Sequence, residues 1–356
     1  MPLHTDLSPS AQTAYAQLLD AGHAADIART VADLPGTFAK KQVKGKPYWY
    51  YQFLDVSGRK RQVYVGPEND KVLALIASGR KTGPKAALGA LARSAAALGN
   101  QPMLTRHFRV IQRLSDYGFF NAGGVLIGTH AFLSFGNMLG VRWTDGQRTQ
   151  DVDFAHAGKA LSIALPSDMV IDIRDAIDSL QMGLLPIEHS DGGAGATYLD
   201  PRDPDFQIDF VTTLHRGGNQ PFRHPKLGVS LQPLKFMEYL LEDVQQAAAF
   251  SGAGVAVVSV PHPARYAFHK LLVAGERPIS RAVKSNKDVQ QAAALLSLLG
   301  ERDEESVQEA LADMARRGPG WVKRLAHGKK LLKRVAPELG VDDWKLPIEN
   351  AASTRT

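Results

Sequence analysis

The sequence predicts an α+β protein with a mixed β-sheet core, a helical C-terminal domain and a small N-terminal β-hairpin module. Residues 120–215 alternate short strand patterns with helical ones, which is typical of a layered unit of sheet and helices. Residues 233–248 and 261–334 have helical periodicity, whereas residues 37–66 place aromatic and β-branched residues between turn signals. We therefore expect an N-terminal part, a sheet domain, a helical domain and a tail at residues 1–100, 101–232, 233–345 and 346–356.

The helices are predicted from their start and stop signals. Ser8 precedes Pro9 at the start of a helix over residues 8–31, because serine caps a helix and proline suits its first position. The other helices are expected at residues 68–99, broken near Gly83-Pro84, at 105–117, and within 261–334, with breaks at Gly300 and at Gly318-Pro319-Gly320.

The composition excludes several classes of protein. The 356 residues are 44% hydrophobic and 22% charged, which is ordinary for a globular chain of two or three domains and unlike a disordered or collagen-like one. There is no cysteine, so disulfides, thiolate metal sites, iron–sulfur clusters and cysteine nucleophiles are excluded. The start of the chain has no secretory pattern, and no apolar run approaches the roughly 20 residues of a membrane span. We expect a cytoplasmic protein that makes no contact with a membrane.

A glycine-containing turn is the first candidate for a binding site. Residues 123–132 form an apolar strand pattern, a turn at Gly128-Thr129 and the start of a helix. Backbone N–H groups at such a helix N-terminus attract phosphate, and the helix dipole favours an anion there. Taken alone, the pattern is more often a tight turn without a ligand.

Three aspartates are the second candidate. Asp151 and Asp153 alternate with apolar residues, which puts both carboxylates on one face of a strand, and Asp209 lies on the polar face of a later strand. Carboxylates side by side repel each other unless a cation lies between them, and Mg²⁺ prefers such oxygen ligands. If the strands pair, three carboxylates make a two-metal site for phosphoryl or nucleotidyl transfer. The alternative is that each aspartate is solvated or caps a turn.

The order of these motifs resembles the polymerase-β-like nucleotidyltransferase superfamily. The matching segments are Ile127-Gly128-Thr129-His130-Ala131, Asp151-Val152-Asp153 and Ile208-Asp209-Phe210. The form from Arg148-Thr149 to Asp153 is most similar to a bacterial branch of abortive-infection and toxin–antitoxin nucleotidyltransferases. The resemblance implies a nucleotidyltransferase fold, an NTP substrate such as ATP, and two Mg²⁺ ions held by Asp151, Asp153 and Asp209.

Later segments extend the resemblance. Residues 266–272 and 284–288 are similar to that branch's Lys-Leu helix and downstream Lys-Asp pair. The resemblance implies that Lys270 contacts the triphosphate and that Lys287 and Asp288 flank it. The full implied nucleotide site is Gly128, Thr129, Arg148, Lys270, Lys287 and Asp288. Thr129 stands where glycine or serine is usual, although it keeps the hydroxyl. A solvated helix face is the alternative for both lysines.

The N-terminal module is strongly basic. Residues 37–66 contain seven Lys and Arg against one acid, Asp55, together with several aromatic residues. Basic groups neutralise phosphates and aromatic rings stack on bases, so this composition indicates nucleic-acid binding. The alternative is an aromatic core with solubilising lysines. The candidate nucleic-acid-binding residues are Lys40, Lys41, Lys44, Lys46, Tyr48, Trp49, Arg59, Lys60 and Arg61.

Together these patterns favour a magnesium-dependent enzyme of the EC 2.7.7 type. It would transfer a nucleotidyl group from an NTP to an acceptor hydroxyl, on an RNA 3′ end such as that of tRNA or on a protein. The resemblance also implies a role in phage defence or a toxin–antitoxin pair, with a cognate antitoxin as partner. One alternative is a catalytically silent protein of the same fold that binds nucleic acid or a partner. Another is an aminoglycoside-modifying enzyme, which the basic module argues against because a small acceptor needs no such surface.

Overall fold

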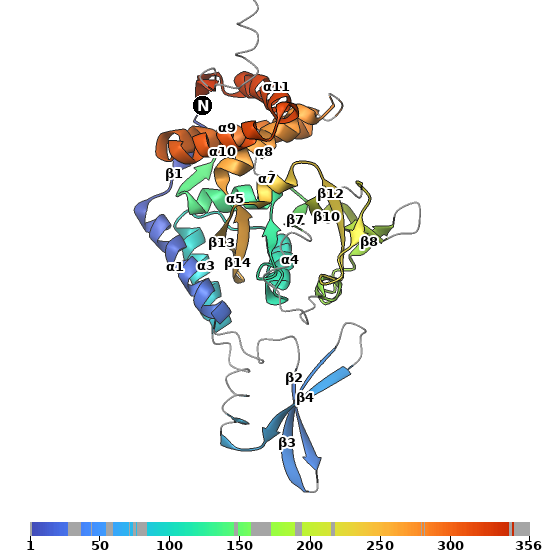
Figure 1. Cartoon of the computed structure of the whole chain (residues 1–356). Helices are drawn as coiled ribbons and strands as arrows, with labels where there is room; N and C mark the ends of the chain where they lie inside the picture. The colour runs from blue at the N-terminus through green and yellow to red at the C-terminus, as the bar shows by residue number, and fades with distance from the viewer. Residues whose placement is uncertain are drawn as a thin grey trace, which may run out of the picture.

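The computed structural model of the chain describes residues 2–27, 37–43, 45–54, 60–70, 72–73, 76, 84–145, 149–157, 172–188, 194–214, 218–278, 280, 282–341 and 344. Arg148, Lys44, Arg59 and the predicted tail lie outside these residues. Figure 1 shows a central sheet with helices on either side of it, a group of helices at one end and a separate small sheet at the other.

A mixed sheet forms the centre of the molecule. Within the described residues it has seven strands, with the order β11-β12-β10-β7-β5, while β9 pairs with β10 and β8 with β9. The pairs β10–β7 and β10–β12 are parallel, and the others are antiparallel. The strands are β5 (Gly124–Leu126), β7 (Val152–His156), β8 (Leu185–Glu188), β9 (Ala194–Asp200), β10 (Asp203–Thr213), β11 (Phe222–Arg223) and β12 (Ser230–Leu234).

Helices cover this sheet because each presents an apolar face to it. Phe108, Ile111 and Leu114 of α4 are buried, and so are Phe132 and Phe135 of α5. The short strands β1 (His4–Asp6) and β6 (Val141–Trp143) pair with each other, and β6 packs against α5. The helices are α4 (Thr105–Asp116), α5 (Gly128–Met138), α6 (Ile173–Asp178) and α7 (Met237–Leu241).

A second packing unit joins the N-terminus to the middle of the chain. The helices α1 (Pro9–Ile27) and α3 (Pro84–Ala97) lie on a hairpin of β13 (Val244–Ser251) and β14 (Gly254–Pro261). Tyr15 and Leu18 share a small core with Phe250, and the Tyr15 hydroxyl accepts a hydrogen bond from the Ala248 amide at 2.9 Å. Residues far apart in sequence therefore meet here.

This hairpin corrects the prediction of a helix over residues 233–248. Only Met237–Leu241 is helical, and strand β13 begins at Val244. Alanine favours a helix by only a fraction of a kcal/mol per residue, and tertiary context overrides so weak a preference. Here β13 pairs with β14 from Val244–Pro261 to Ser251–Gly254, and the backbone hydrogen bonds of the pair decide the conformation.

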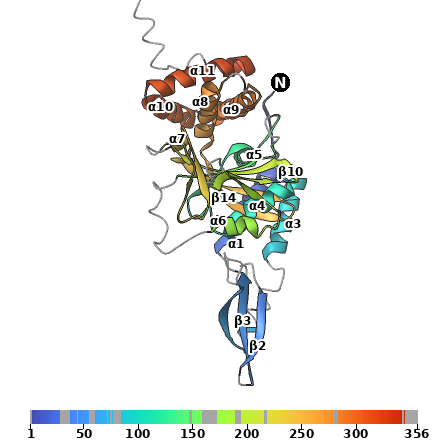
Figure 2. The ribbon, with the colours of Figure 1, turned by 90° about the vertical axis from the view of Figure 1, so that its right-hand side faces the viewer.

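Four helices form the C-terminal region, which lies as a group at one end of the molecule in both views (Figures 1 and 2). The predicted break at Gly300 is wrong, because α9 continues through it to Arg302, and Asp303 then caps α10 through the Ser306 amide. The predicted break at Gly318 is confirmed. The helices are α8 (Pro263–Glu276), α9 (Ala282–Arg302), α10 (Glu304–Arg316) and α11 (Pro319–Val335), followed by a 3-10 turn at Pro337–Leu339.

The N-terminal module, predicted as a small β-hairpin module, is a three-stranded antiparallel sheet. Its order is β2-β3-β4, and Figures 1 and 2 show it apart from the main body. Within the described residues, no helix has the length and apolar character needed to cross a membrane. The strands are β2 (Thr37–Val43), β3 (Lys46–Leu54) and β4 (Lys60–Pro67).

Candidate functional site

The turn between β5 and α5 needs a glycine. Gly128 has φ of +60°, a left-handed conformation that L side chains rarely adopt. A Cβ at this position would lie 1.9 Å from Oδ2 of Asp153. Because Ile127, which precedes α5, gives no side-chain cap, the first amides of the helix are available to a ligand. The turn thus places a helix N-terminus directly against a carboxylate.

The strands bring two of the three aspartates side by side. Asp153 of β7 and Asp209 of β10 are register partners in parallel strands, so the strand pairing expected from the sequence is present. Asp151 lies one residue before β7. Oδ1 of Asp209 accepts a hydrogen bond from the Thr197 hydroxyl of β9 at 2.5 Å. The three carboxyl groups therefore come from two adjacent strands inside the sheet and the residue just before one of them.

Burial and mutual repulsion disfavour the ionised forms of these aspartates. Burial, and then the charge of Asp209, raise the pKa of Asp153 to about 6. The same two causes raise the pKa of Asp151, although Lys284 and Lys287 of α9 act against them. A cation bound here would relieve the repulsion between the carboxylates.

An ion-pair cluster around the buried Asp288 lies on the helical side of the site. Lys270 Nζ of α8 is 2.6 Å from Oδ1 of Asp288, and Arg277 pairs with the other oxygen of the same carboxylate. Burial alone would raise the pKa of Asp288, but the charges of Lys270 and Arg277 outweigh it and hold the pKa below its usual range. Asp288 is therefore ionised and holds Lys270 in place.

A hydrogen-bond network ties the helices to the glycine turn. The Tyr266 hydroxyl lies 2.8 Å from the Gly128 carbonyl oxygen and 2.8 Å from Oε1 of Gln291. Nε2 of Gln291 is 3.4 Å from the Thr129 hydroxyl, and Tyr266 and Gln291 are both buried. Residues of α8 and α9 therefore hold both residues of the turn.

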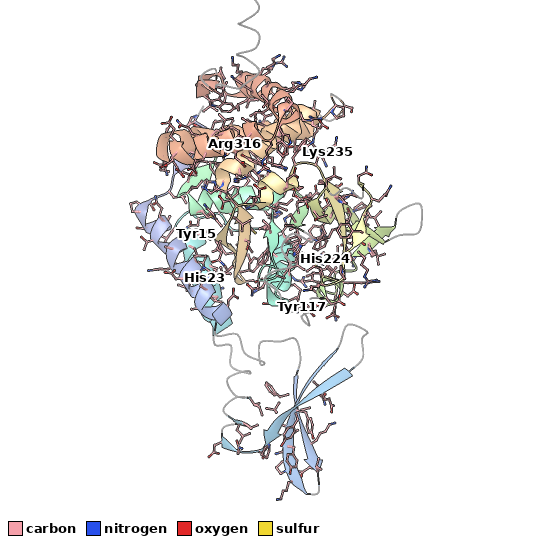
Figure 3. All side chains as sticks on the ribbon, viewed as in Figure 1. Tyr15, His23, Tyr117, His224, Lys235 and Arg316 are labelled. Atoms are coloured by element: carbon pink, nitrogen blue, oxygen red, sulfur yellow. The ribbon has the colours of Figure 1, made fainter. Side chains whose placement is uncertain are left out.

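These elements surround a pocket of about 620 Å³. One part of its wall is charged and carries Asp151, Asp153, Lys270 and Asp288. Another part is apolar and is formed by Phe236, Met237, Leu240 and Val273. Figure 3 labels a further lining residue, Lys235, where the helical region meets the sheet. A charged and an apolar part suit a ligand that has a phosphate chain and an aromatic base.

The pocket gathers most of the residues predicted to bind the nucleotide or the metal. Among the described members of that set, Asp209 is the exception, because it stands beside Asp153 but is not among the lining residues. Sequence reasoning missed Arg277, Tyr266, Gln291 and Lys284. The spacing of Lys284 and Lys287 could have identified the last of these, since residues three apart share a helix face. The predicted residues in the lining are Gly128, Thr129, Asp151, Asp153, Lys270, Lys287 and Asp288.

The donor set fits Mg²⁺, but not as a ready-made cage. Among the residues that the structure describes, no three acidic or histidine side chains are grouped so that they could hold a metal ion by themselves. Mg²⁺ is usually held by one or two carboxylates and completes its coordination with waters and substrate phosphates. Asp151 and Asp153 therefore suit an ion that is held jointly with a triphosphate.

The N-terminal sheet uses some of its predicted binding residues internally. Lys40 Nζ is 2.7 Å from Oε2 of Glu68, and the buried Trp49 indole donates to the same carboxylate at 2.9 Å. Trp49 therefore packs within the module, and the prediction that it contacts nucleic acid is corrected. Lys44 and Arg59 lie outside the described residues, as do the side chains of Lys60 and Arg61. Lys41, Lys46 and Tyr48 are at least partly exposed.

Comparison with known proteins gives two similarities. A family model described as "Nucleotidyltransferase" matches residues 105–316, which is more than half of the chain. Among solved structures, the chain is similar to an antigenic nucleotidyltransferase-like protein from Paracoccidioides brasiliensis, with 15% identity and a TM-score of 0.32. That similarity covers 64% of this chain and 95% of the other. No curated protein matches.

Proposed function

We propose that this chain, which belongs to the nucleotidyltransferase family, transfers a nucleotidyl group from an NTP to an acceptor hydroxyl with the help of Mg²⁺. The acceptor is an RNA 3′ end or a protein hydroxyl. One observation carries the proposal: Asp153 is the register partner of Asp209 and lies against Gly128, at the N-terminus of α5. Carboxylates for a cation and amides for a phosphate thus meet at one point.

The residues divide the binding of the triphosphate between them. The first amides of α5 and the Lys270 ammonium face the same pocket and suit phosphate oxygens. Mg²⁺ held by Asp151 and Asp153, with Asp209 beside them, would neutralise charge on the triphosphate. The apolar wall at Phe236 suits the base.

The reaction exchanges one bond to phosphorus for another. The acceptor oxygen forms a bond to the α-phosphorus. The bond between the α-phosphorus and the oxygen that it shares with the β-phosphate breaks, and pyrophosphate leaves. We assign Asp209 either to receive the acceptor's proton or to help hold a second ion, because of its place beside Asp153. Lys270, fixed by Asp288, is placed to stabilise the charge on the leaving phosphates.

Label transfer tests the proposal. Each common NTP, labelled on its α-phosphate, is incubated with Mg²⁺, the protein and either total RNA or total protein from a lysate. We expect label in one acceptor class, and its loss in Asp151→Ala and Asp153→Asn. Asp178→Asn is the matched control, because this aspartate is exposed on α6 and is not among the pocket's lining residues. Undiminished transfer by either site variant would refute this assignment of the site.

A catalytically silent binding protein is the second candidate. It is favoured by the hydrogen bond between the Thr197 hydroxyl and Asp209, which engages a carboxylate that the reaction would need. In that case NTP would bind the wild type, but no label would move to any acceptor. A role in phage defence or a toxin–antitoxin pair stays a prediction.

A further inference from the structure

The two faces of the N-terminal sheet differ in what covers them. Trp49 of β3 is buried, and its register partner in β4 is Gly66. The Val72 side chain lies close above Gly66, because a Cβ added to this glycine would be 3.0 Å from it. Ile76, a little further along the chain, is also buried. Val72, which follows β4, therefore lies on the Trp49 face of the sheet, beside Gly66.

The opposite face presents a cluster of three tyrosines. The rings of Tyr48 and Tyr50 lie 6.1 Å and 5.5 Å from that of Tyr64, between ring centroids. Tyr64 is 54% exposed, and Tyr48 and Tyr50 are partly exposed. The Lys41 ammonium lies 5.1 Å from the Tyr50 ring centroid, at the edge of the same cluster. Among the described side chains of the module, the most exposed aromatic ring thus belongs to a cluster that lies beside positive charge.

This combination matches the chemistry of an unpaired nucleic-acid strand. Each nucleobase has a flat face that stacks on an aromatic side chain, and each phosphate is attracted by lysine. In a duplex the base faces are already stacked on one another, so a stacking surface selects single strands. The segment from residue 37 to residue 66 carries seven basic residues against one acid, which complements the charge of the phosphates.

We propose that the face formed by Tyr48, Tyr50 and Tyr64, with Lys41 at its edge, binds single-stranded RNA by stacking. The choice of RNA rests on the proposed function, because it makes this strand the acceptor that receives the nucleotide. Trp49 and Lys40 maintain the sheet through Glu68 and take no part in stacking. The sheet thus selects the acceptor while the pocket binds the NTP.

Binding of labelled oligouridine of about 12 nucleotides by the full-length protein tests the proposal, since single-strand sites span roughly 4–16 nucleotides. The protein carries Asp153→Asn, so that binding is measured without turnover. We expect Tyr64→Ala to weaken binding about tenfold, Tyr64→Leu to weaken it similarly, and Tyr64→Phe to leave it unchanged, because only the ring is needed. Leu98→Ala, a truncation of a similarly exposed apolar side chain in the main body, should have no effect.

Several outcomes would overturn the inference. They are full retention of binding in Tyr64→Leu, equal affinity for a duplex of the same length, and equal or tighter binding of the matching DNA strand. Tyr64→Phe keeps the ring, so its binding would show that a substitution at this position does not by itself unfold the module. Label transfer with wild-type Asp153 separates the two proposals. Two results would show that this face does not bind the acceptor. One is transfer to RNA that Tyr64→Ala leaves undiminished, and the other is transfer to protein alone. RNA binding that needs Tyr64 without any transfer refutes the proposed function instead.

Discussion

Two walls of the pocket each carry an aspartate, but the neighbours of these two carboxylates have opposite charge. On the helical wall, Asp288 is paired with Lys270 and Arg277, and these charges lower its pKa. On the sheet wall, Asp153 stands beside Asp209, and burial together with that charge raises its pKa to about 6. The same residue type thus has opposite environments across one pocket. A carboxylate with its own cations stabilises the fold, whereas one beside another carboxylate favours binding of a cation from solution.

Removing the paired carboxylate should have the largest effect. Asp288→Ala leaves Lys270 and Arg277 as two partly buried cations without their partner, so we expect the free energy of unfolding to fall by about 3 kcal/mol. Urea denaturation measures this change. Asp178→Ala, which removes an exposed aspartate 4.0 Å from Arg174, should change stability by less than about 0.5 kcal/mol. Similar small losses in both variants would contradict the difference drawn between the walls.

The pH dependence of stability should isolate the sheet wall. Because the pKa of Asp153 is raised from 3.8 in the unfolded chain to about 6 in the folded protein, the folded state binds more protons between these values. Asp153 therefore adds about 3 kcal/mol to the free energy of unfolding below pH 3.8. This contribution is lost as the pH rises through 6.

Denaturation of wild type and Asp153→Asn at a series of pH values measures this contribution. Burial lowers the pKa of His130 to about 3 and that of His269 to about 3, which destabilises the folded state as the pH falls below about 6.5. Both proteins share this opposite slope, so only the difference between them reports Asp153. A constant difference from pH 4 to pH 7 would mean that Asp153 does not titrate as described.

Mg²⁺ should stabilise the protein through the same wall. At a concentration about tenfold above its Kd, an ion that binds only the folded state adds about 1.4 kcal/mol. We expect a rise in Tm for wild type above pH 6, where Asp153 is ionised, and a smaller one at pH 5. Asp153→Asn should abolish the rise, whereas Asp288→Asn should keep it. An equal rise in the Tm of Asp153→Asn would show that the cation binds elsewhere.

The smallest effect should come from the network between the walls. Tyr266→Phe removes the hydroxyl that contacts the Gly128 carbonyl and Gln291, so we expect a loss of about 1 kcal/mol in stability. We also expect the KM for NTP to rise, because the turn at Gly128 is then held less firmly. An unchanged KM with lowered stability would show that Tyr266 supports the fold alone.

Local patterns predicted much of this site. The alternation around Asp153 and Asp209 identified both strands, and the glycine turn identified the start of α5. The helix over residues 233–248 was wrong, since β13 takes its conformation from β14 and Tyr15. Arg277 was missed because nothing near it in sequence shows that it meets Asp288.

The order of turn, carboxylates and lysines follows from local patterns in the chain, because alternation in a strand and the freedom of glycine are local properties. Three-dimensional packing, in contrast, sets which charges are compensated and which aromatic rings face water. It paired Lys270 with Asp288, and it buried Trp49 while leaving Tyr64 exposed. The reason is physical: pKa and exposure depend on all neighbours in space, and most of these neighbours are distant along the chain.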